Sequence, residues 1–563
     1  MMKETRLRVD AVRSRSSELE NDLIDAYRGG TISRRDFVRR GTVIGVSLPL
    51  LGFLASACGS GEKGGEQTDR SQQPKVKKGG TIRSGIAAPT GALDPLTLNN
   101  YGGIAILGQS GEYLTWADTK LRLQPRLAES WNPNRDGSVW TFKLRRGIRF
   151  QDGRPLAAAD VVATIDRLAD PDGGSNSLSA FRGVLSKGNA TAVDDATVEF
   201  QLDAPNGNFP YLVSSDNYNA IILPRDFDGD WEKTFIGTGP WKLEKFTPDI
   251  GVTFVKNPDY WDTTRQPNAD RSELRFYSKE QAAVLAMQGG EVDVVAQFSA
   301  SGGRALLTDP NVRTIALRSA THDEVHTRTD IEPFRDKRVR QALALLVDRR
   351  ALVDGLFAEK ADPGNDSPFA PGYASTDASV AQRQQDVEKA KQLLADAGKA
   401  DGFSVKLSTL DELYVPDHAQ LLQNDAKQAG IEITLEISDK ASYYGDSVFG
   451  ESRWLDSTLG ITNYAHRAVP NVLLGAPLKS DGTWNAAHFH NEDYDKLVDD
   501  YAAALDVESQ RTTANKIQTL LLDEVPVQYP FFASYLTAVK KTVAGVEPTA
   551  TGHLDLRGAG STA

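Results

Sequence analysis

Hydrophobic and polar residues alternate in several short segments, and this period of two predicts β-strands. Trp140, Phe142 and Leu144 are each separated by one residue, so an extended chain places all three side chains on one face. The same alternation recurs over 198–202 and over 431–437. Each segment therefore predicts a strand with one buried face and one polar face.

A period of three to four residues predicts helices elsewhere in the chain. Val339, Ala342, Leu343, Leu346 and Val347 form an apolar stripe on an otherwise basic helix. Further helices are predicted over 387–397, with Gly398 as the C-terminal stop, near 417–429, over 493–504 and over 508–522.

The order of these segments indicates the fold class. A strand over 403–409 precedes the helix near 417–429, and the strand over 431–437 follows it. This order is a βαβ unit, which predicts an α/β fold with a partly parallel sheet. A chain of 563 residues exceeds one hydrophobic core, so we expect two to four domains.

Composition and charge exclude several classes of protein. Hydrophobic residues make up 40% of the chain and charged residues 25%, which excludes a mostly disordered protein. The net charge of −12 argues against a nucleic-acid partner, because such proteins neutralise phosphates with an excess of Lys and Arg. A single cysteine excludes an intramolecular disulfide and a cysteine-caged metal. We expect no cofactor and no metal.

The N-terminus carries the pattern of an export signal. A charged region containing Arg34 and Arg35 precedes an apolar run that ends in small residues before Cys58. Ser-Arg-Arg-x-Phe resembles the twin-arginine export motif, and the cysteine position resembles a bacterial lipidation site. We therefore predict a signal peptide over 1–57, lipidation of Cys58 and a flexible polar tether over 58–78. The alternative is a free buried cysteine in a membrane-anchored N-terminus.

Known catalytic motifs are missing from the sequence. It contains no Gly-x-Ser-x-Gly, no phosphate-binding Gly-x-x-x-x-Gly-Lys and no His-Glu-x-x-His. His488 and His490 are only a weak metal signal, because a third ligand is missing. These observations favour a binding protein. An exported hydrolase with an unrecognised site remains the alternative from another class.

An ordered set of motifs carries a family resemblance. It comprises Pro125-Arg126-Leu127-Ala128-Glu129-Ser130-Trp131, Trp140-Thr141-Phe142-Lys143-Leu144, Phe150-Gln151-Asp152-Gly153, Gly237-Thr238-Gly239-Pro240-Trp241, Phe334-Arg335-Asp336-Lys337-Arg338 and Asn491-Glu492-Asp493-Tyr494. From about residue 79 to about residue 536, the chain resembles the family 5 extracellular solute-binding proteins of bacterial ABC importers, the peptide/nickel-binding class.

The resemblance implies a periplasmic-binding-protein-like clamshell of two lobes, with an extra domain on the first lobe. The implied boundaries are 79–118, 223–318 and 528–563 for domain I, 119–222 for the extra domain II, and 319–527 for domain III, the second lobe. Two chain crossings, near Arg318 and Gln528, would form the hinge. Ligand would bind in the interdomain cleft and be delivered to an ABC permease in the membrane. We expect a monomer anchored by lipid on the outer face of the cytoplasmic membrane.

The resemblance also selects candidate ligand contacts in domain III. Peptide-binding members hold the peptide α-amino group with an aspartate, where this chain has Asn463 followed by His466 and Arg467. Arg467 suits a carboxylate or phosphate, so we expect a neutral or anionic ligand. Asp456 from a shifted register is an alternative cationic anchor, and Arg467 could instead pair with a surface acid.

Other candidates come from loops expected to border the cleft. They are Asn99 and Tyr101 in the first loop, Arg328 and Asp330 after the first hinge crossing, and Trp484. Arg328 and Asp330 are two residues apart, so we expect them on one strand face, either as a polar cleft wall or satisfying each other. Core packing is the competing interpretation of Trp484.

The sequence thus predicts an exported binding lipoprotein that captures a small organic molecule or peptide for an importer. A peptide binder that grips the ligand backbone is the alternative within the same class.

Overall fold

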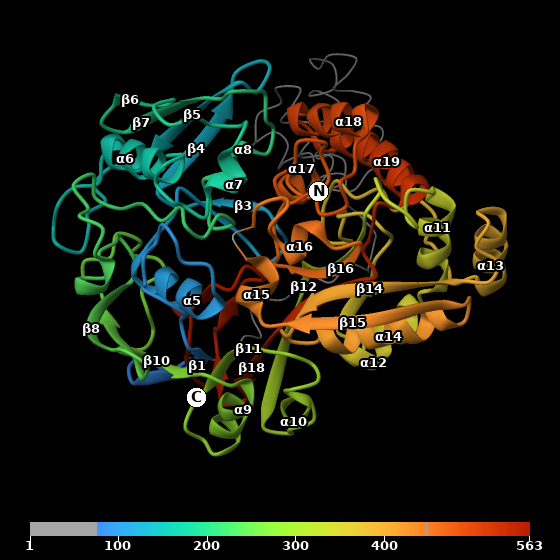
Figure 1. Ribbon diagram of the computed structural model, residues 1–563. Coiled ribbons are helices and arrows are strands. Elements are labelled where there is room, and N and C mark those ends of the chain that lie inside the picture. The colour runs from blue at the N-terminus through green and yellow to red at the C-terminus, as the bar shows by residue number, and fades with distance from the viewer. Residues whose placement is uncertain (1–75, 446, 563) are drawn as a thin grey trace, which may run out of the picture. The chain divides into compact units, whose positions relative to one another are not determined.

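A sheet of twelve strands forms the centre of the fold (Figure 1). The computed structural model describes residues 76–445 and 447–562, so the predicted signal peptide, Arg34, Arg35 and Cys58 lie outside the described residues. The path of the sheet is β15 (Ile431–Ser438), β14 (Phe403–Leu410), β16 (Leu459–Tyr464), β12 (Val312–Thr327), β18 (Phe531–Lys540), β11 (Val294–Phe298), β1 (Thr81–Ala87), β10 (Arg271–Tyr277), β9 (Gly251–Lys256) and β8 (Trp241–Thr247). Off this path, β13 (Ala361–Pro363) pairs with β18, and β17 (Val527–Gln528) pairs with β12.

The long strand β12 joins the two ends of this sheet. Its first part, from Val312 to Thr321, pairs with β18, with a register shift between Leu317 and Thr321. Its second part, from His322 to Thr327, pairs with β16. We call the strands from β18 to β8 the first lobe and those from β16 to β15 the second lobe. One strand therefore passes from one lobe into the other.

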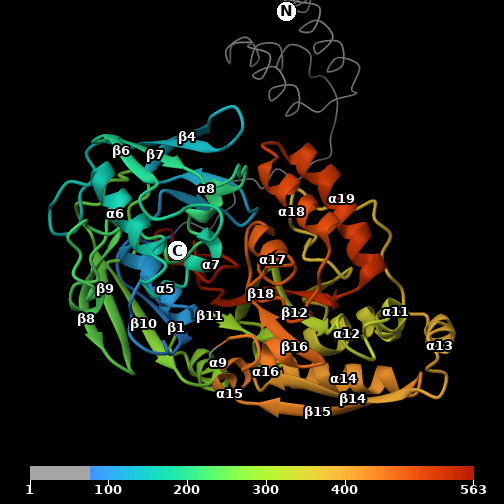
Figure 2. The same cartoon turned by 45° about the horizontal axis from the view of Figure 1, so that its top comes forward.

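The second lobe contains the predicted βαβ unit. Strands β14 and β15 are parallel in register from Phe403↔Ile431 to Leu410↔Ser438. The helix between them is α14 (Val415–Lys427), which lies against both strands in Figure 1 and Figure 2. The prediction of a βαβ unit is confirmed.

The predicted helices of the second lobe are also confirmed. They are α11 (Lys337–Leu346), α13 (Val387–Asp396), α18 (Glu492–Ala503) and α19 (Val507–Glu524). Asp386 caps α13 through the backbone N–H of Lys389, and Gly398 follows the helix with a φ of 73°. A left-handed residue just past a helix is the position that favours glycine.

A separate sheet of four strands is inserted in the sequence between β1 and β8 of the first lobe. Its order is β4 (Ala128–Pro133), β5 (Val139–Leu144), β7 (Thr197–Gln201) and β6 (Ala190–Asp194), and all its pairs are antiparallel. Trp140, Phe142 and Leu144 are buried on one face of β5, as their alternation predicts. This sheet has α6 (Ala158–Leu168) as its main helix.

The remaining elements are short or connect the sheets. They are α5 (Tyr101–Ser110), β2 (Thr115–Ala117), β3 (Leu123–Pro125), α7 (Leu178–Phe181), α8 (Phe209–Leu212), η2 (Trp231–Lys233), α9 (Glu280–Gln288), α10 (Arg304–Leu307), α12 (Arg349–Phe357), α15 (Lys440–Tyr444), α16 (Arg453–Asp456), α17 (Asn471–Gly475), β19 (Val543–Ala544), β20 (Glu547–Pro548), β21 (Leu554–Asp555) and β22 (Gly560–Ser561).

The apolar cores follow the same division. One large cluster joins the strands of the first lobe to the four-stranded sheet, through residues such as Leu274, Phe142 and Phe200. Two other clusters belong to the second lobe. Separate cores leave a boundary between the lobes where side chains need not fill all the space.

Candidate ligand-binding site

A cavity of about 400 Å³ lies between the two lobes. The first lobe contributes the ends of β1 and β11 and the N-terminus of α9, together with Tyr101. The second lobe contributes the end of α12, the segment 412–414 and Asn463. Thr321, at the partner switch of β12, also lines it. The volume falls within the range typical of small-molecule sites, which is roughly 300–1,000 Å³.

Tyr101 reaches this cavity from the first turn of α5. Asn100 caps the helix, because its Oδ1 accepts the backbone N–H of Gly103 at 2.9 Å. Gly102, which follows Tyr101, packs so closely on β1 that a Cβ there would lie 2.0 Å from the carbonyl oxygen of Ala87. This contact holds α5 against the strand and positions Tyr101, whose ring centre lies 5.6 Å from that of Tyr535. The two tyrosines form an aromatic wall.

Asn463 faces the cavity from β16, and a buried polar network holds its amide. Its Nδ2 donates to Oδ1 of Asp323 at 2.8 Å and to the hydroxyl of Tyr414 at 3.2 Å. Asp323 lies directly opposite Asn463 in the β12–β16 pair, and its other oxygen accepts from Nδ1 of His418 at 2.9 Å. Asp323 and His418 are fully buried.

Sequence reasoning missed Asp323 and His418. The available signal was the run His322-Asp323-Glu324-Val325-His326, which places polar side chains on both faces of a strand in the interior of a sheet. Polar groups are buried in this way only when they find partners.

The cavity carries charges of both signs. The Glu280 carboxylate is already hydrogen-bonded within the protein, because it accepts the backbone N–H of Ser299 at 2.8 Å. Glu412 pairs with Lys440 at 3.4 Å. Lys279 and Lys360 also line the cavity, and neither forms an ion pair within the part of the chain that the structure describes. Two free ammonium groups and two engaged carboxylates therefore border the site.

Comparison with known families decides the identity of this fold. The family model described as "Bacterial extracellular solute-binding proteins, family 5 Middle" matches residues 122–466. The chain belongs to this family. Family 5 members are the binding proteins of ABC importers, so this protein binds a solute for transport and is not an enzyme.

Two characterised relatives align with most of this chain. The dipeptide-binding protein DppE of Bacillus subtilis is 24% identical over 92% of this chain and 97% of that protein. The glutathione-binding protein GsiB of Salmonella choleraesuis is 27% identical over 77% of this chain and 85% of that protein. Among solved structures, the substrate-binding protein CtaP of Listeria monocytogenes superposes with a TM-score of 0.75 at 23% identity, over 86% of this chain and 100% of that one. The two-lobed periplasmic-binding-protein fold is thereby confirmed.

His466 and Arg467 of this family 5 protein do not line the 400 Å³ cavity. His466 is buried, and its Nδ1 accepts the backbone N–H of Ala320 at 2.9 Å. Burial lowers the pKa of His466 to about 3, so the imidazole is neutral.

Arg467 lines a second space of about 20 Å³ together with Asp216 and Tyr218. Its guanidinium lies 5.8 Å from the ring centre of Tyr218. Asp216 accepts the backbone N–H of Ala468 at 2.7 Å, and burial raises the pKa of Asp216 to about 6. The structure therefore does not bring Arg467 and Asn463 to one cavity, and Arg467 faces a buried acid.

Arg328 and Asp330 satisfy each other. Nε and Nη2 of Arg328 donate to the two carboxylate oxygens of Asp330, each at 2.8 Å. The Arg328 hydrogen bonds hold the pKa of Asp330 below its ordinary value. Strand β12 ends at Thr327, so the prediction of a common strand face is wrong, because the chain turns before it reaches Asp330. Neither residue lines the 400 Å³ cavity.

The remaining candidates also lie outside this cavity. Trp484 packs partly buried against Tyr464, with 6.0 Å between ring centres. Asn99 is exposed beside the cap of α5. Asp456, the alternative anchor, accepts the backbone N–H groups of Gly450 and Ser452.

Across residues 76–445 and 447–562, no three His, Cys, Asp or Glu side chains gather closely enough to hold a metal ion. Over the same two stretches, every helix is too short or too polar to cross a membrane.

Proposed function

We propose that this protein is an exported lipoprotein that captures a peptide or another small organic molecule in the 400 Å³ cavity and delivers it to its ABC permease. The observation that carries the proposal is the cavity itself, which lies between the lobes and combines aromatic walls with a few polar groups. The relatives that bind dipeptides and glutathione support a ligand with amide bonds.

Tyr101 and Asn463 are the proposed ligand contacts among the residues that the sequence predicts. Lys279 and Lys360 join them as free cations at the cavity. Because Arg467 lines a different space, it supplies no argument for an anionic ligand. We propose a neutral or zwitterionic ligand.

The proposed domains keep the boundaries predicted from the sequence. Domain I holds the strands of the first lobe, domain II the four-stranded sheet, and domain III the βαβ unit. The separate four-stranded sheet supports domain II, and the separate apolar clusters of the second lobe support domain III. The hinge would lie at the partner switch of β12 and at β17.

Native mass spectrometry of the purified protein tests the binding site. Protein prepared from peptide-rich medium should carry an organic ligand. A Ser534→Trp variant fills the cavity, since Ser534 lines it, and should lose the added mass. A ligand that persists on the Trp variant at wild-type occupancy would place the binding site elsewhere.

Cell fractionation tests the proposed export and anchoring. Cys58→Ser should move the protein from membranes to the soluble exported fraction, because the thiol is the proposed lipid attachment point. Arg34→Lys combined with Arg35→Lys should retain the precursor in the cytoplasm. Membrane retention of a processed Cys58→Ser protein, or normal export of the double-Lys variant, would contradict the corresponding step.

A further inference from the structure

At the second-lobe end of the cavity, the positions of the hydrogen-bond donor and acceptor of the Asn463 amide are fixed. A carboxylate oxygen accepts hydrogen bonds, so the group of Asn463 that lies 2.8 Å from Asp323 is its amide nitrogen. Asp323 is also held by His418, from α14, at 2.9 Å. The buried pair therefore determines which way the Asn463 amide faces, and rotation of that amide would set two acceptors against each other.

Both hydrogens of the Asn463 amide are occupied by protein partners. One is directed to Asp323. The other reaches the hydroxyl oxygen of Tyr414 at 3.2 Å, with the carbonyl oxygen of His322 as a more distant acceptor at 3.4 Å. Within the described chain, no protein group donates to Oδ1 of Asn463, and the hydroxyl hydrogen of Tyr414 has no protein acceptor. Asn463 and Tyr414 both line the cavity. The wall thus presents a free acceptor next to a free donor.

We propose that this end of the cavity binds an uncharged amide group of the ligand, either a peptide unit or a carboxamide. The ligand N–H would donate to Oδ1 of Asn463, and the ligand carbonyl would accept from the Tyr414 hydroxyl. The inference rests on the proposed function, because it takes the cavity as the ligand site. It replaces the charged anchor that the family resemblance implies at this position with a neutral one.

Charged groups match this pair less well. A ligand ammonium group can donate to Oδ1 of Asn463 but cannot accept the hydrogen bond of the Tyr414 hydroxyl. A ligand carboxylate can accept from Tyr414 but has no hydrogen to donate to Oδ1 of Asn463. Each would leave one buried polar group unpaired, and such mismatches are a main source of specificity. Asp323 is a positioning residue in this scheme, since it acts on the ligand only through Asn463.

Calorimetric titration with two matched probes tests the proposal. The probes are alanine with an N-acetyl and a C-amide block, which carries two amide groups, and unblocked alanine, which carries none. The wild-type protein should prefer the blocked probe by about tenfold or more, which corresponds to about 1.4 kcal/mol or more. Tyr414→Phe keeps the ring and removes the donor, so it should abolish most of that preference. Tyr444→Phe is the matched control, because it removes a hydroxyl from α15 of the same lobe, outside the cavity, and should leave the preference unchanged.

A second pair of variants separates positioning from folding. Asp323→Asn frees the Asn463 amide to rotate, so the ratio of the two affinities should fall towards one while the protein stays folded. Asn463→Asp should shift the preference towards the unblocked probe, whose ammonium group pairs with a carboxylate.

An unblocked probe that binds wild-type protein as well as the blocked one would overturn the proposal, as would an unchanged ratio in Tyr414→Phe. Failure of both probes to bind would also overturn it, and would leave solute binding to be judged by the mass-spectrometric test.

Discussion

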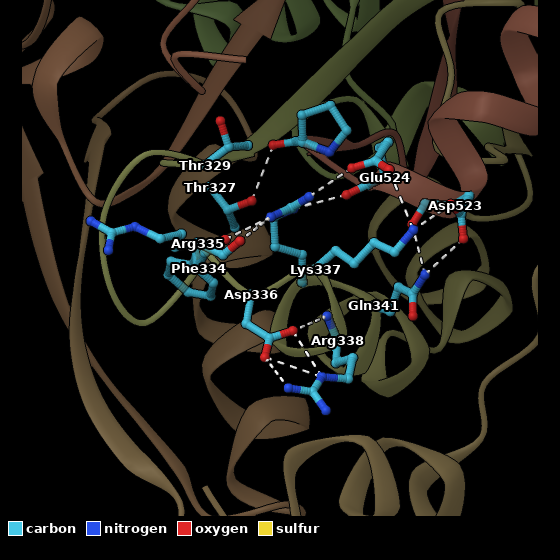
Figure 3. A network of polar contacts seen from close by, with 12 residues as sticks. Thr327, Thr329, Phe334, Arg335, Asp336, Lys337, Arg338, Gln341, Asp523 and Glu524 are labelled. Atoms are coloured by element: carbon cyan, nitrogen blue, oxygen red, sulfur yellow. Dashed lines mark hydrogen bonds and ion pairs between the residues drawn. The ribbon is translucent and has the colours of Figure 1, made fainter. Parts of the chain in front are cut away.

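Replacing Arg340 with alanine should lower the free energy of unfolding by about 3 kcal/mol. The guanidinium is buried, with a side chain only 4% exposed. It donates to the carbonyl oxygens of Phe334 and Glu524, each at 2.8 Å, and to the Glu524 carboxylate at 3.2 Å. Figure 3 labels the two acceptor residues, Phe334 and Glu524. Alanine would remove this donor from both carbonyl oxygens, while the Glu524 carboxylate would keep its contact with Lys337 at 3.4 Å. The network joins α11 to the end of α19, directly before β17 returns to the sheet.

Urea unfolding measures this effect. Arg338→Ala is the matched control, because Arg338 lies on the same helix but its side chain is 46% exposed and pairs with Asp336. Its unfolding midpoint should stay close to that of the wild type. Equal midpoints for the two variants would show that burial of the Arg340 network contributes little.

Replacing Glu324 with glutamine should stabilise the protein at alkaline pH. Glu324 is buried on β12, and its Oε2 accepts from the Tyr529 hydroxyl at 2.8 Å. Burial raises the pKa of Glu324 from an ordinary value of 4.5 to about 8, against the smaller opposing effect of the Tyr529 hydrogen bond. The folded protein therefore holds a proton on Glu324 that the unfolded chain releases.

The sign of the pH dependence follows from this difference. The stability contributed by protonated Glu324 is fully present below pH 4.5 and is lost as the pH rises through about 8. The slope is about 1.4 kcal/mol per pH unit, so the loss between pH 5.5 and 8 is about 3 kcal/mol. Glutamine stays neutral and still offers an oxygen to Tyr529, so Glu324→Gln should remove this slope.

Urea unfolding of both proteins at several pH values checks the prediction. The stability difference should widen in favour of Glu324→Gln as the pH increases. Glu388→Gln is the control, because that side chain is 86% exposed. Parallel stability curves for the wild type and Glu324→Gln would contradict a raised pKa at this position.

Much of the fold could be predicted from local periodicity. The strand at β5, the basic helix α11 and the βαβ unit around α14 each repeat a hydrophobic pattern over enough residues to identify the element. The candidate site was harder, because it depends on where elements end. Arg467 is four residues from Asn463 in sequence. Because β16 ends at Tyr464, between the two residues, their side chains line different cavities.

The most informative site residues could not be located by spacing at all. Asp323 and His418 are 95 residues apart and meet only through the packing of α14 on the sheet. A contact between residues so far apart in sequence leaves no trace in the local hydrophobic pattern. Tyr101, by contrast, was accessible to sequence reasoning, because the segment after the opening strand was expected to border the cleft. The expectation of a loop was wrong for Tyr101, which is the first residue of helix α5.

The partner switch in β12, which is the proposed hinge, lies beside the residues that hold Asn463, the proposed ligand contact. Thr321 lines the cavity at the last β18 pairing, and Asp323, two residues further on, orients Asn463. A bend at this strand would therefore move the floor of the cavity and the support of Asn463 together. We expect substitutions at this part of β12 to change ligand affinity and the rate of opening together.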